Sequence, residues 1–240
     1  MTARRTLRTL ILATIASPCL AVAGAAPDPR EAPEAVVQVY GARAMGVKGW
    51  FAVHTWVAVK PTDATAYTVY EVIGWRLRWS ESALVVRTRQ PDAPWFGSAP
   101  ELYAEKRGPG VDELINRIDK AVRDYPYAGE YTLWPGPNSN TFTAWIARHV
   151  PELELDLPAT AIGKDYLGST VFSTAPSGSG FQFSLGGLLG IAASGVDGLE
   201  VNLLGLNFGV GPSGLKLPLL GRLGMPRLGD AVATEQSVER

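Results

Sequence analysis

The residue with the clearest chemical potential in this sequence is a serine at the start of a predicted helix. Ser139 lies within residues 131–150, where a Pro-Gly-Pro turn leads into Asn-Ser-Asn and then into apolar residues at helical spacing. Backbone N–H groups point outward at a helix start, and the helix dipole favours negative charge there. Ser139 therefore fits two interpretations, a nucleophile and a residue that caps the helix.

A nucleophilic serine needs a general base, and His54 is the candidate for that role. His54 lies in the strand pattern of residues 50–60, and the next predicted strand contains Glu71, which would orient the imidazole ring. The alternatives to Glu71 as the orienting residue are Thr55, Tyr70 and Asn140.

Three neighbours would complete such a site. In the catalytic interpretation, Asn138 and Asn140 contribute to a turn that supplies hydrogen-bond donors to an oxyanion, and Trp56 lines a groove beside His54. In the structural interpretation, His54 is a buried histidine held by hydrogen bonds. The residue types and their spacing leave both interpretations open.

Composition narrows the classes of partner and cofactor. The chain has 240 residues, a net charge of -1, 19% charged residues and 46% hydrophobic residues, which is typical of a globular protein without an electrostatic footprint for nucleic acid. The single cysteine, Cys19, lies in the predicted leader, so a processed chain would have no disulfide or thiol chemistry. Since His54 and His149 are the only histidines, a histidine-rich metal site is not expected, and we expect no metal site and no cofactor.

The N-terminus has the pattern of an export signal. Arg4, Arg5 and Arg8 precede an uncharged apolar or small-residue run over 10–26, and the A-x-A pattern favours cleavage after Ala23 or Ala25. The pattern predicts a signal peptide over residues 1–26 and export to the periplasm or cell envelope. An uncleaved membrane anchor is the alternative interpretation.

After a linker over residues 27–35, residues 36–170 predict an α+β domain. Strand patterns occupy 36–40, 50–60, 65–75 and 83–88, and the short connection between the second and third favours an antiparallel sheet. An amphipathic helix is predicted over 111–124, and its first turn is acidic. Residues 90–109 are rich in proline and glycine and predict an irregular segment.

Charged residues in this domain are interpreted as surface features. Arg87 and Arg89 belong to a basic region that we expect on a solvated sheet face, and Lys164 and Asp165 predict a surface ion pair. Residues 171–225 predict glycine-rich β-hairpins, followed by a disordered tail over 226–240. The favoured interpretation of the hairpins is a sheet packed on the domain, and the alternative is a membrane-surface or partner contact.

Two stretches carry a family resemblance: FAVHTWVAVK at 51–60 and PGPNSNTFTAWIAR at 135–148. They resemble the permuted NlpC-type papain-like fold, whose N-C-x-x-F pattern would place the nucleophile at Ser139. More closely, the chain resembles a bacterial family described only as a domain of unknown function, which also has an A-I-G-K-D-Y segment like that at 161–166. This resemblance covers residues 36–211 and implies a permuted papain-like fold with no established activity.

Serine in place of the papain-type cysteine leads to three hypotheses. The first is a non-catalytic envelope protein whose groove binds a cell-wall fragment, a peptide or a lipid head group. The second is a serine-dependent amidase or esterase that uses Ser139, His54 and Glu71. The third is a membrane-associated structural protein that makes a peripheral membrane contact through its hairpins.

Overall fold

The computed structural model describes residues 26–224. The predicted signal peptide and the predicted disordered tail lie outside these residues, apart from Ala26. Within the described range, no helix is both long enough and apolar enough to cross a membrane. The described chain forms two antiparallel sheets and two α-helices, which confirms the expected mixture of α and β structure.

The first sheet has five strands in the order β4-β3-β2-β1-β5. All neighbouring pairs are antiparallel, and Val39 of β1 lies opposite Val57 of β2. The strands are β1 (Val36–Arg43), β2 (Val53–Lys60), β3 (Thr68–Val72), β4 (Leu84–Thr88) and β5 (Glu101–Arg107).

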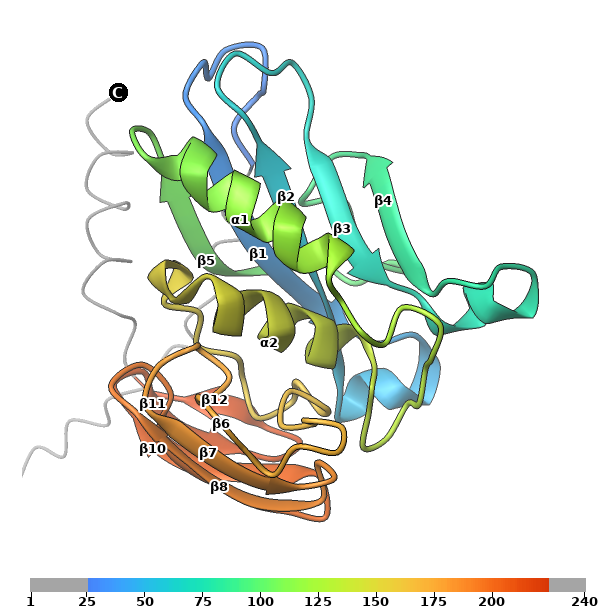
Figure 1. The fold of residues 1–240 in the computed structure, drawn as a ribbon, viewed down its shortest axis with the longest axis vertical. Coiled ribbons are helices and arrows are strands. Elements are labelled where there is room, and N and C mark those ends of the chain that lie inside the picture. The colour runs from blue at the N-terminus through green and yellow to red at the C-terminus, as the bar shows by residue number, and fades with distance from the viewer. Residues whose placement is uncertain (1–25, 225–240) are drawn as a thin grey trace, which may run out of the picture.

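Both helices cover one face of the first sheet (Figure 1). Helix α1 (Val111–Arg123) buries an apolar stripe that includes Ile115 and Ile118, and helix α2 (Ser139–His149) buries Phe142 and Ile146. These side chains pack with the odd-numbered residues of β1 and β2 into one core. Only the odd-numbered residues of these strands reach this core, because residues two apart in a strand point to the same face.

The opposite face of the first sheet has a second core, which is rich in aromatic residues. Tyr40, Trp56 and Tyr67 are almost fully buried there, together with Trp95 from the loop that follows β4. Ala26 and Pro27 also contact this core, because Ala26 packs against it and the Tyr67 hydroxyl donates to the Pro27 carbonyl over 3.1 Å. The first sheet is therefore covered on both faces.

The second sheet has seven strands in the order β12-β11-β10-β9-β8-β7-β6, a meander in which sequence neighbours pair. It lies beyond α2 at the lower end of the molecule in Figure 1. Its strands are β6 (Phe172–Ser173), β7 (Phe181–Leu185), β8 (Leu189–Ser194), β9 (Gly198–Leu203), β10 (Leu206–Gly211), β11 (Gly214–Leu217) and β12 (Gly221–Leu223).

The two faces of the second sheet differ sharply. The charged residues of its strands and turns, Asp197, Glu200, Lys216 and Arg222, all lie on the inner side and are buried or partly buried. We call the opposite side the outer face. The outer face consists of Phe172, Phe181, Phe183, Leu185, Leu189, Ile191, Ala193, Leu199, Val201, Leu203, Leu206, Phe208, Val210, Leu215, Leu217 and Leu223.

Two expectations about local structure have different outcomes. The predicted helix over 111–124 is confirmed by α1. The interpretation of residues 90–109 as wholly irregular is wrong, because β5 forms the edge of the first sheet beside β1. Its sequence ELYAEKR is rich in charged residues, which suits an exposed edge strand but gives a weak strand signal. Short 3-10 helices occupy Gly46–Trp50, Gly74–Arg78 and Pro151–Leu153.

Candidate functional site

The polar start of α2 is a complete helix cap. Asn138 is the N-cap, and its side-chain oxygen accepts hydrogen bonds from the backbone N–H groups of Asn140 at 2.9 Å and Thr141 at 3.2 Å. The Asn138 N–H donates in return to the Thr141 hydroxyl over 3.1 Å, which closes a capping box. The interpretation of Ser139 as the cap is therefore wrong, since Ser139 is the first helical residue.

The amide side chains of this turn are also bound to protein. Asn138 and Asn140 both donate from Nδ2 to the Ile162 carbonyl, at 3.0 and 2.8 Å. Gly163 has φ +96°, and a Cβ there would lie 2.3 Å from Asn138 Nδ2, so only glycine lets the 161–166 segment approach this closely. The side chains expected to be oxyanion donors thus hold two segments of the fold together.

Ser139 itself lies in a buried position, with 4% of its surface exposed. Its backbone carbonyl accepts a hydrogen bond from the Thr55 hydroxyl over 3.3 Å. The Thr55 hydroxyl is also 2.8 Å from the Thr143 hydroxyl and 3.0 Å from Asn140 Oδ1, so Thr55 faces α2. Within residues 26–224, no hydrogen bond involves the Ser139 hydroxyl.

His54 and Glu71 form a hydrogen-bonded pair across two strands. The distance between His54 Nε2 and Glu71 Oε2 is 3.1 Å. Arg87 donates to the other Glu71 oxygen from two nitrogens, at 2.9 and 2.6 Å, and Arg89 Nε lies 3.8 Å from it. The expectation of a merely solvated face is therefore wrong for Arg89, whose side chain is 15% exposed, whereas Arg87 stays 45% exposed while it pairs with the buried carboxylate of Glu71.

Aromatic rings enclose this pair. The His54 ring stacks on Trp95 with centroids 3.9 Å apart and an interplanar angle of 14°. Trp56 stacks on Tyr40, donates from Nε1 to the Pro91 carbonyl over 2.9 Å, and carries the Arg89 guanidinium 4.8 Å above its ring. Trp56 is fully buried and therefore belongs to the core rather than to an open groove.

Burial determines the charge state of the pair. Burial lowers the pKa of His54 below 6.5, although the hydrogen bond to Glu71 opposes the shift. Burial alone would raise the pKa of Glu71, but the hydrogen bond from His54 and the charges of Arg87 and Arg89 lower it overall. Near neutral pH the contact therefore joins a neutral imidazole to a carboxylate that two arginines stabilise.

The sheet separates His54 from Ser139. Consecutive residues of a strand point to opposite faces, and Thr55 points to α2. His54 consequently points to the aromatic core on the far face, where it stacks on Trp95. The structure brings His54 together with Glu71 and does not bring either into hydrogen-bond contact with Ser139. Within residues 26–224, no hydrogen bond joins the His54–Glu71 pair to a serine hydroxyl.

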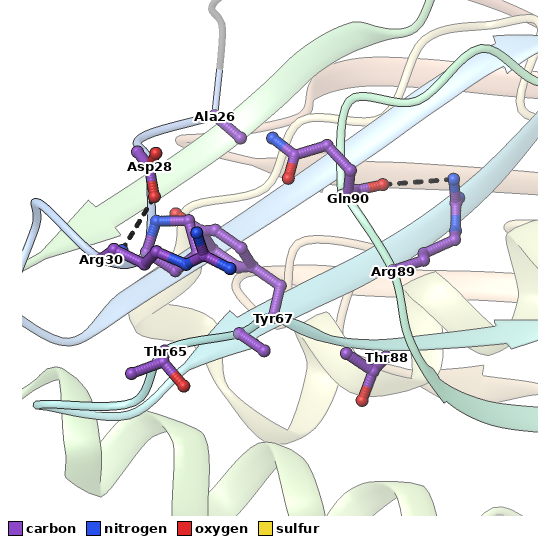
Figure 2. Close-up of a pocket in the computed structure, with 10 residues that line it drawn as sticks. Ala26, Asp28, Arg30, Thr65, Tyr67, Thr88, Arg89 and Gln90 are labelled. Carbon is purple, nitrogen blue, oxygen red and sulfur yellow. Dashed lines mark hydrogen bonds between the residues drawn. The ribbon is translucent and has the colours of Figure 1, made fainter.

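A surface pocket of about 390 Å³ lies beside the aromatic core (Figure 2). Ala26, Asp28 and Arg30 form one side of it, and Arg89 and Gln90 form the other. The N-terminal segment therefore supplies a wall of this pocket. The pocket is formed by different residues from those predicted for the site.

A buried charge cluster joins residues 156–164, which follow α2, to the second sheet. Lys164 ion-pairs with Glu200, which also pairs with Lys216; Lys216 pairs with Asp156, and Asp156 with Arg222 at 3.0 Å. Burial alone would lower the pKa of Lys164, but nearby carboxylates, including that of Glu200, raise it overall. The alternating signs leave each charge with a counter-charge, which makes its burial tolerable.

Asp165 has its own set of partners in the second sheet. Its carboxylate accepts hydrogen bonds from the amides of Gln182 at 2.9 Å, Asn202 at 3.2 Å and Asn207 at 2.7 Å. The expectation of a surface ion pair between Lys164 and Asp165 is therefore wrong, because both are buried and each binds the second sheet. Sequence reasoning missed these contacts because their partners lie 17–42 residues further along the chain.

Within residues 26–224, three acidic side chains of the charge cluster region lie close together. Oxygens of Asp156, Asp197 and Glu200 lie within 4.8 Å of one another. The Lys216 ammonium contacts Asp156 and Glu200 and donates to the Asp197 carbonyl over 2.9 Å. A lysine side chain therefore supplies the positive charge that this group of carboxylates requires.

Comparison with known proteins places the chain in a family. The model of a family described as "protein of unknown function (DUF3750)" matches residues 34–166, more than half of the chain. The match includes the first sheet, both helices and the segment with Lys164 and Asp165, and it ends before the second sheet. No curated protein and no solved structure matches the chain. The chain therefore belongs to the DUF3750 family of proteins of unknown function.

Proposed function

We propose that this protein is an exported, non-catalytic protein of the bacterial cell envelope that binds a lipid surface through the outer face of its second sheet. The observation that carries the proposal is that this face consists of apolar side chains over all seven strands. Val210 is 58% exposed, Leu199 is 49% exposed and Phe181 is 53% exposed. Exposed apolar patches of this extent mark binding surfaces.

The chemistry of the face favours lipid over a protein partner. Even the apolar interfaces of homodimers contain polar groups, at about a third of their area. The strands of the outer face contribute no charged side chain, because Glu200, Lys216 and Arg222 point inward. The alternation of apolar outward and polar inward residues is the pattern of strands that face lipid.

The rim of the sheet fits a position at the membrane surface. Trp134 is 49% exposed and donates from its indole nitrogen to the Leu204 carbonyl, at the turn between β9 and β10, over 3.0 Å. Tryptophan is enriched where a membrane meets water. An open sheet leaves unpaired backbone groups along its edge strands, which cannot be satisfied in hydrocarbon. The sheet would therefore lie on the lipid rather than span it.

The arrangement of Ser139 supports the non-catalytic part of the proposal. Its hydroxyl has no base within hydrogen-bond reach among residues 26–224, because His54 binds Glu71 on the far face of the sheet. We include a permuted papain-like arrangement in this proposal, and the packing of helix α2 on strand β2 supports it. The alternative, a serine-dependent amidase or esterase, predicts that a fluorophosphonate labels Ser139 and that His54→Ala abolishes the label; we expect no labelling.

Vesicle flotation tests lipid binding. We expect the protein to float with vesicles of phosphatidylethanolamine and phosphatidylglycerol, and Val210→Asp to weaken binding about tenfold or more, because burial of one valine contributes ~1.5 kcal/mol or more. Val86→Asp is the matched control, since Val86 is a strand valine with 55% exposure in the first sheet. Equal binding by both variants would contradict the assignment to the outer face. A stable dimer that does not float, and that Val210→Asp dissociates, would replace lipid with a second copy of the chain.

A further inference from the structure

Ala26 forms a hydrogen bond to an acidic side chain. The Ala26 backbone nitrogen donates to Asp92 Oδ2 over 3.0 Å. Ala26 also packs against the aromatic core on the far face of the first sheet. Among residues 26–224, Ala26 is the sole hydrogen-bond donor to Asp92, and no ion pair involves that carboxylate. This half-buried acid therefore points at one backbone nitrogen, and Arg89 acts on it electrostatically without forming an ion pair.

The sequence before Ala26 fits a cleavage site. Ala23 and Ala25 occupy the two small-residue positions of an A-x-A pattern that ends immediately before Ala26. We propose that the chain is cut between Ala25 and Ala26, and that the new α-ammonium group of Ala26 forms an ion pair with Asp92. This inference rests on the export part of the proposed function.

Hydrolysis of the Ala25–Ala26 peptide bond consumes one water, leaves a carboxylate on Ala25 and converts the Ala26 amide into an amine that takes up a proton. The nitrogen that now donates one hydrogen to Asp92 would then carry three hydrogens and a positive charge. The cut would thus give Asp92 a cation in direct hydrogen-bond contact, which Arg89 does not provide. The same end is fixed at a second point by the Tyr67 hydroxyl on the Pro27 carbonyl.

Capture of the new end would also complete the second core. Ala26 packs against the aromatic core, Pro27 accepts a hydrogen bond from Tyr67, and Asp63 donates from its N–H to the Pro33 carbonyl over 2.8 Å at the far end of this segment. Figure 2 shows Ala26, Asp28 and Arg30 along the pocket wall. The ion pair would hold this wall in place at the end where a short segment otherwise frays.

The position of the cut is tested by the intact mass of the protein recovered after expression of the full chain, leader included, in a bacterial host. We expect Ala26 as the first residue. A first residue of Gly24 would overturn this inference and leave the export proposal standing. Retention of the whole leader on the folded protein would overturn both.

The ion pair is tested with chains released from a fusion by a protease that leaves no extra residue. One chain begins at Ala26 and the other at Gly24, in which Ala26 keeps an uncharged amide. We expect Asp92→Asn to lower the Tm of the chain that begins at Ala26 by about 2 °C more than that of the longer chain. The difference should be present below pH ~8 and fade at higher pH, because Asp92 raises the pKa of the ammonium and its effect ends when that group loses its proton. Equal shifts in both chains would overturn the capture by Asp92.

Discussion

In both sheets of this protein, successive side chains alternate between the two faces. The first sheet buries its apolar side chains, whereas the second sheet buries its polar side chains. The first sheet buries both of its faces, one under α1 and α2 and the other under aromatic rings and Ala26. The second sheet buries amides and charges on its inner side and exposes aliphatic and aromatic side chains on its outer face. Alternation along a strand therefore identifies which residues share a face and leaves open which face is inside.

The inverted orientation of the second sheet depends on pairing among the buried charges. Glu200 lies between Lys164 and Lys216, and Asp156 lies between Lys216 and Arg222. A shift in strand register by one residue would expose these charges and bury the outer face. The charges therefore fix both the orientation and the register of the sheet.

The largest expected difference in unfolding free energy is between two phenylalanine-to-alanine variants, one beside each sheet. Phe142→Ala should lower the free energy of unfolding by about 3–5 kcal/mol, because Phe142 is fully buried between α2 and the first sheet. Phe208→Ala on the outer face, where 43% of the side chain is exposed, should change it by about 1 kcal/mol or less and should weaken vesicle flotation. Urea unfolding measures both values. A large loss for Phe208→Ala in water would mean that the outer face is packed in the free protein.

The next effect concerns the charges inside the second sheet. Glu200→Gln should lower the free energy of unfolding by about 3 kcal/mol, because it leaves two buried lysines without their shared carboxylate. Glu152→Gln, which removes an exposed pair with Arg117, is the matched control and should have little effect. Similar small losses in both variants would show that the charge cluster does not attach the sheet.

The smallest expected effect is a pH dependence that belongs to the first sheet. Burial lowers the pKa of His54 below its unfolded value, so the unfolded chain takes up a proton first as the pH falls. Stability from this group is fully present above pH ~6.5 and declines below it, by at most ~1.4 kcal/mol per pH unit.

His54→Gln should reduce the loss of stability between pH ~6.5 and ~5 by about 1 kcal/mol, as measured by urea unfolding at each pH. His149→Gln provides the control, since His149 lies at the exposed end of α2. An unchanged pH dependence in the His54 variant would show that the loss arises elsewhere in the chain.

Local patterns in the sequence predicted most of the first sheet and helix α1, because the information for them lies within each segment. Strand β5 was not predicted because its charged residues give a weak strand signal. They suit the edge of a sheet, and that edge exists only because β5 pairs with β1. The position of Ser139 shows that the sequence pattern located the helix start only to within one residue. The Asn-Ser-Asn run predicted a capped helix start, yet the cap falls on Asn138, one residue earlier.

The remaining features depend on contacts that are distant in sequence. The pairing of His54 with Glu71 spans 17 residues and follows from adjacent strands, whereas the face on which it lies depends on where α2 packs. The contacts of Lys164 and Asp165 span up to 42 residues and lead into a sheet whose residues appeared to be a peripheral extension. Lys164 and Asp165 therefore mark the place where the second sheet attaches to the rest of the protein, and not a solvated surface.

The meander of the second sheet has a consequence for the order in which the chain folds. Each hairpin closes over a short turn, and local contacts form fast. The attachments close much longer loops, 36 residues from Lys164 to Glu200 and 66 from Asp156 to Arg222. We expect the hairpins to form before they attach to the rest of the protein. The face proposed to bind lipid is then also the face most exposed to aggregation while the chain is still folding.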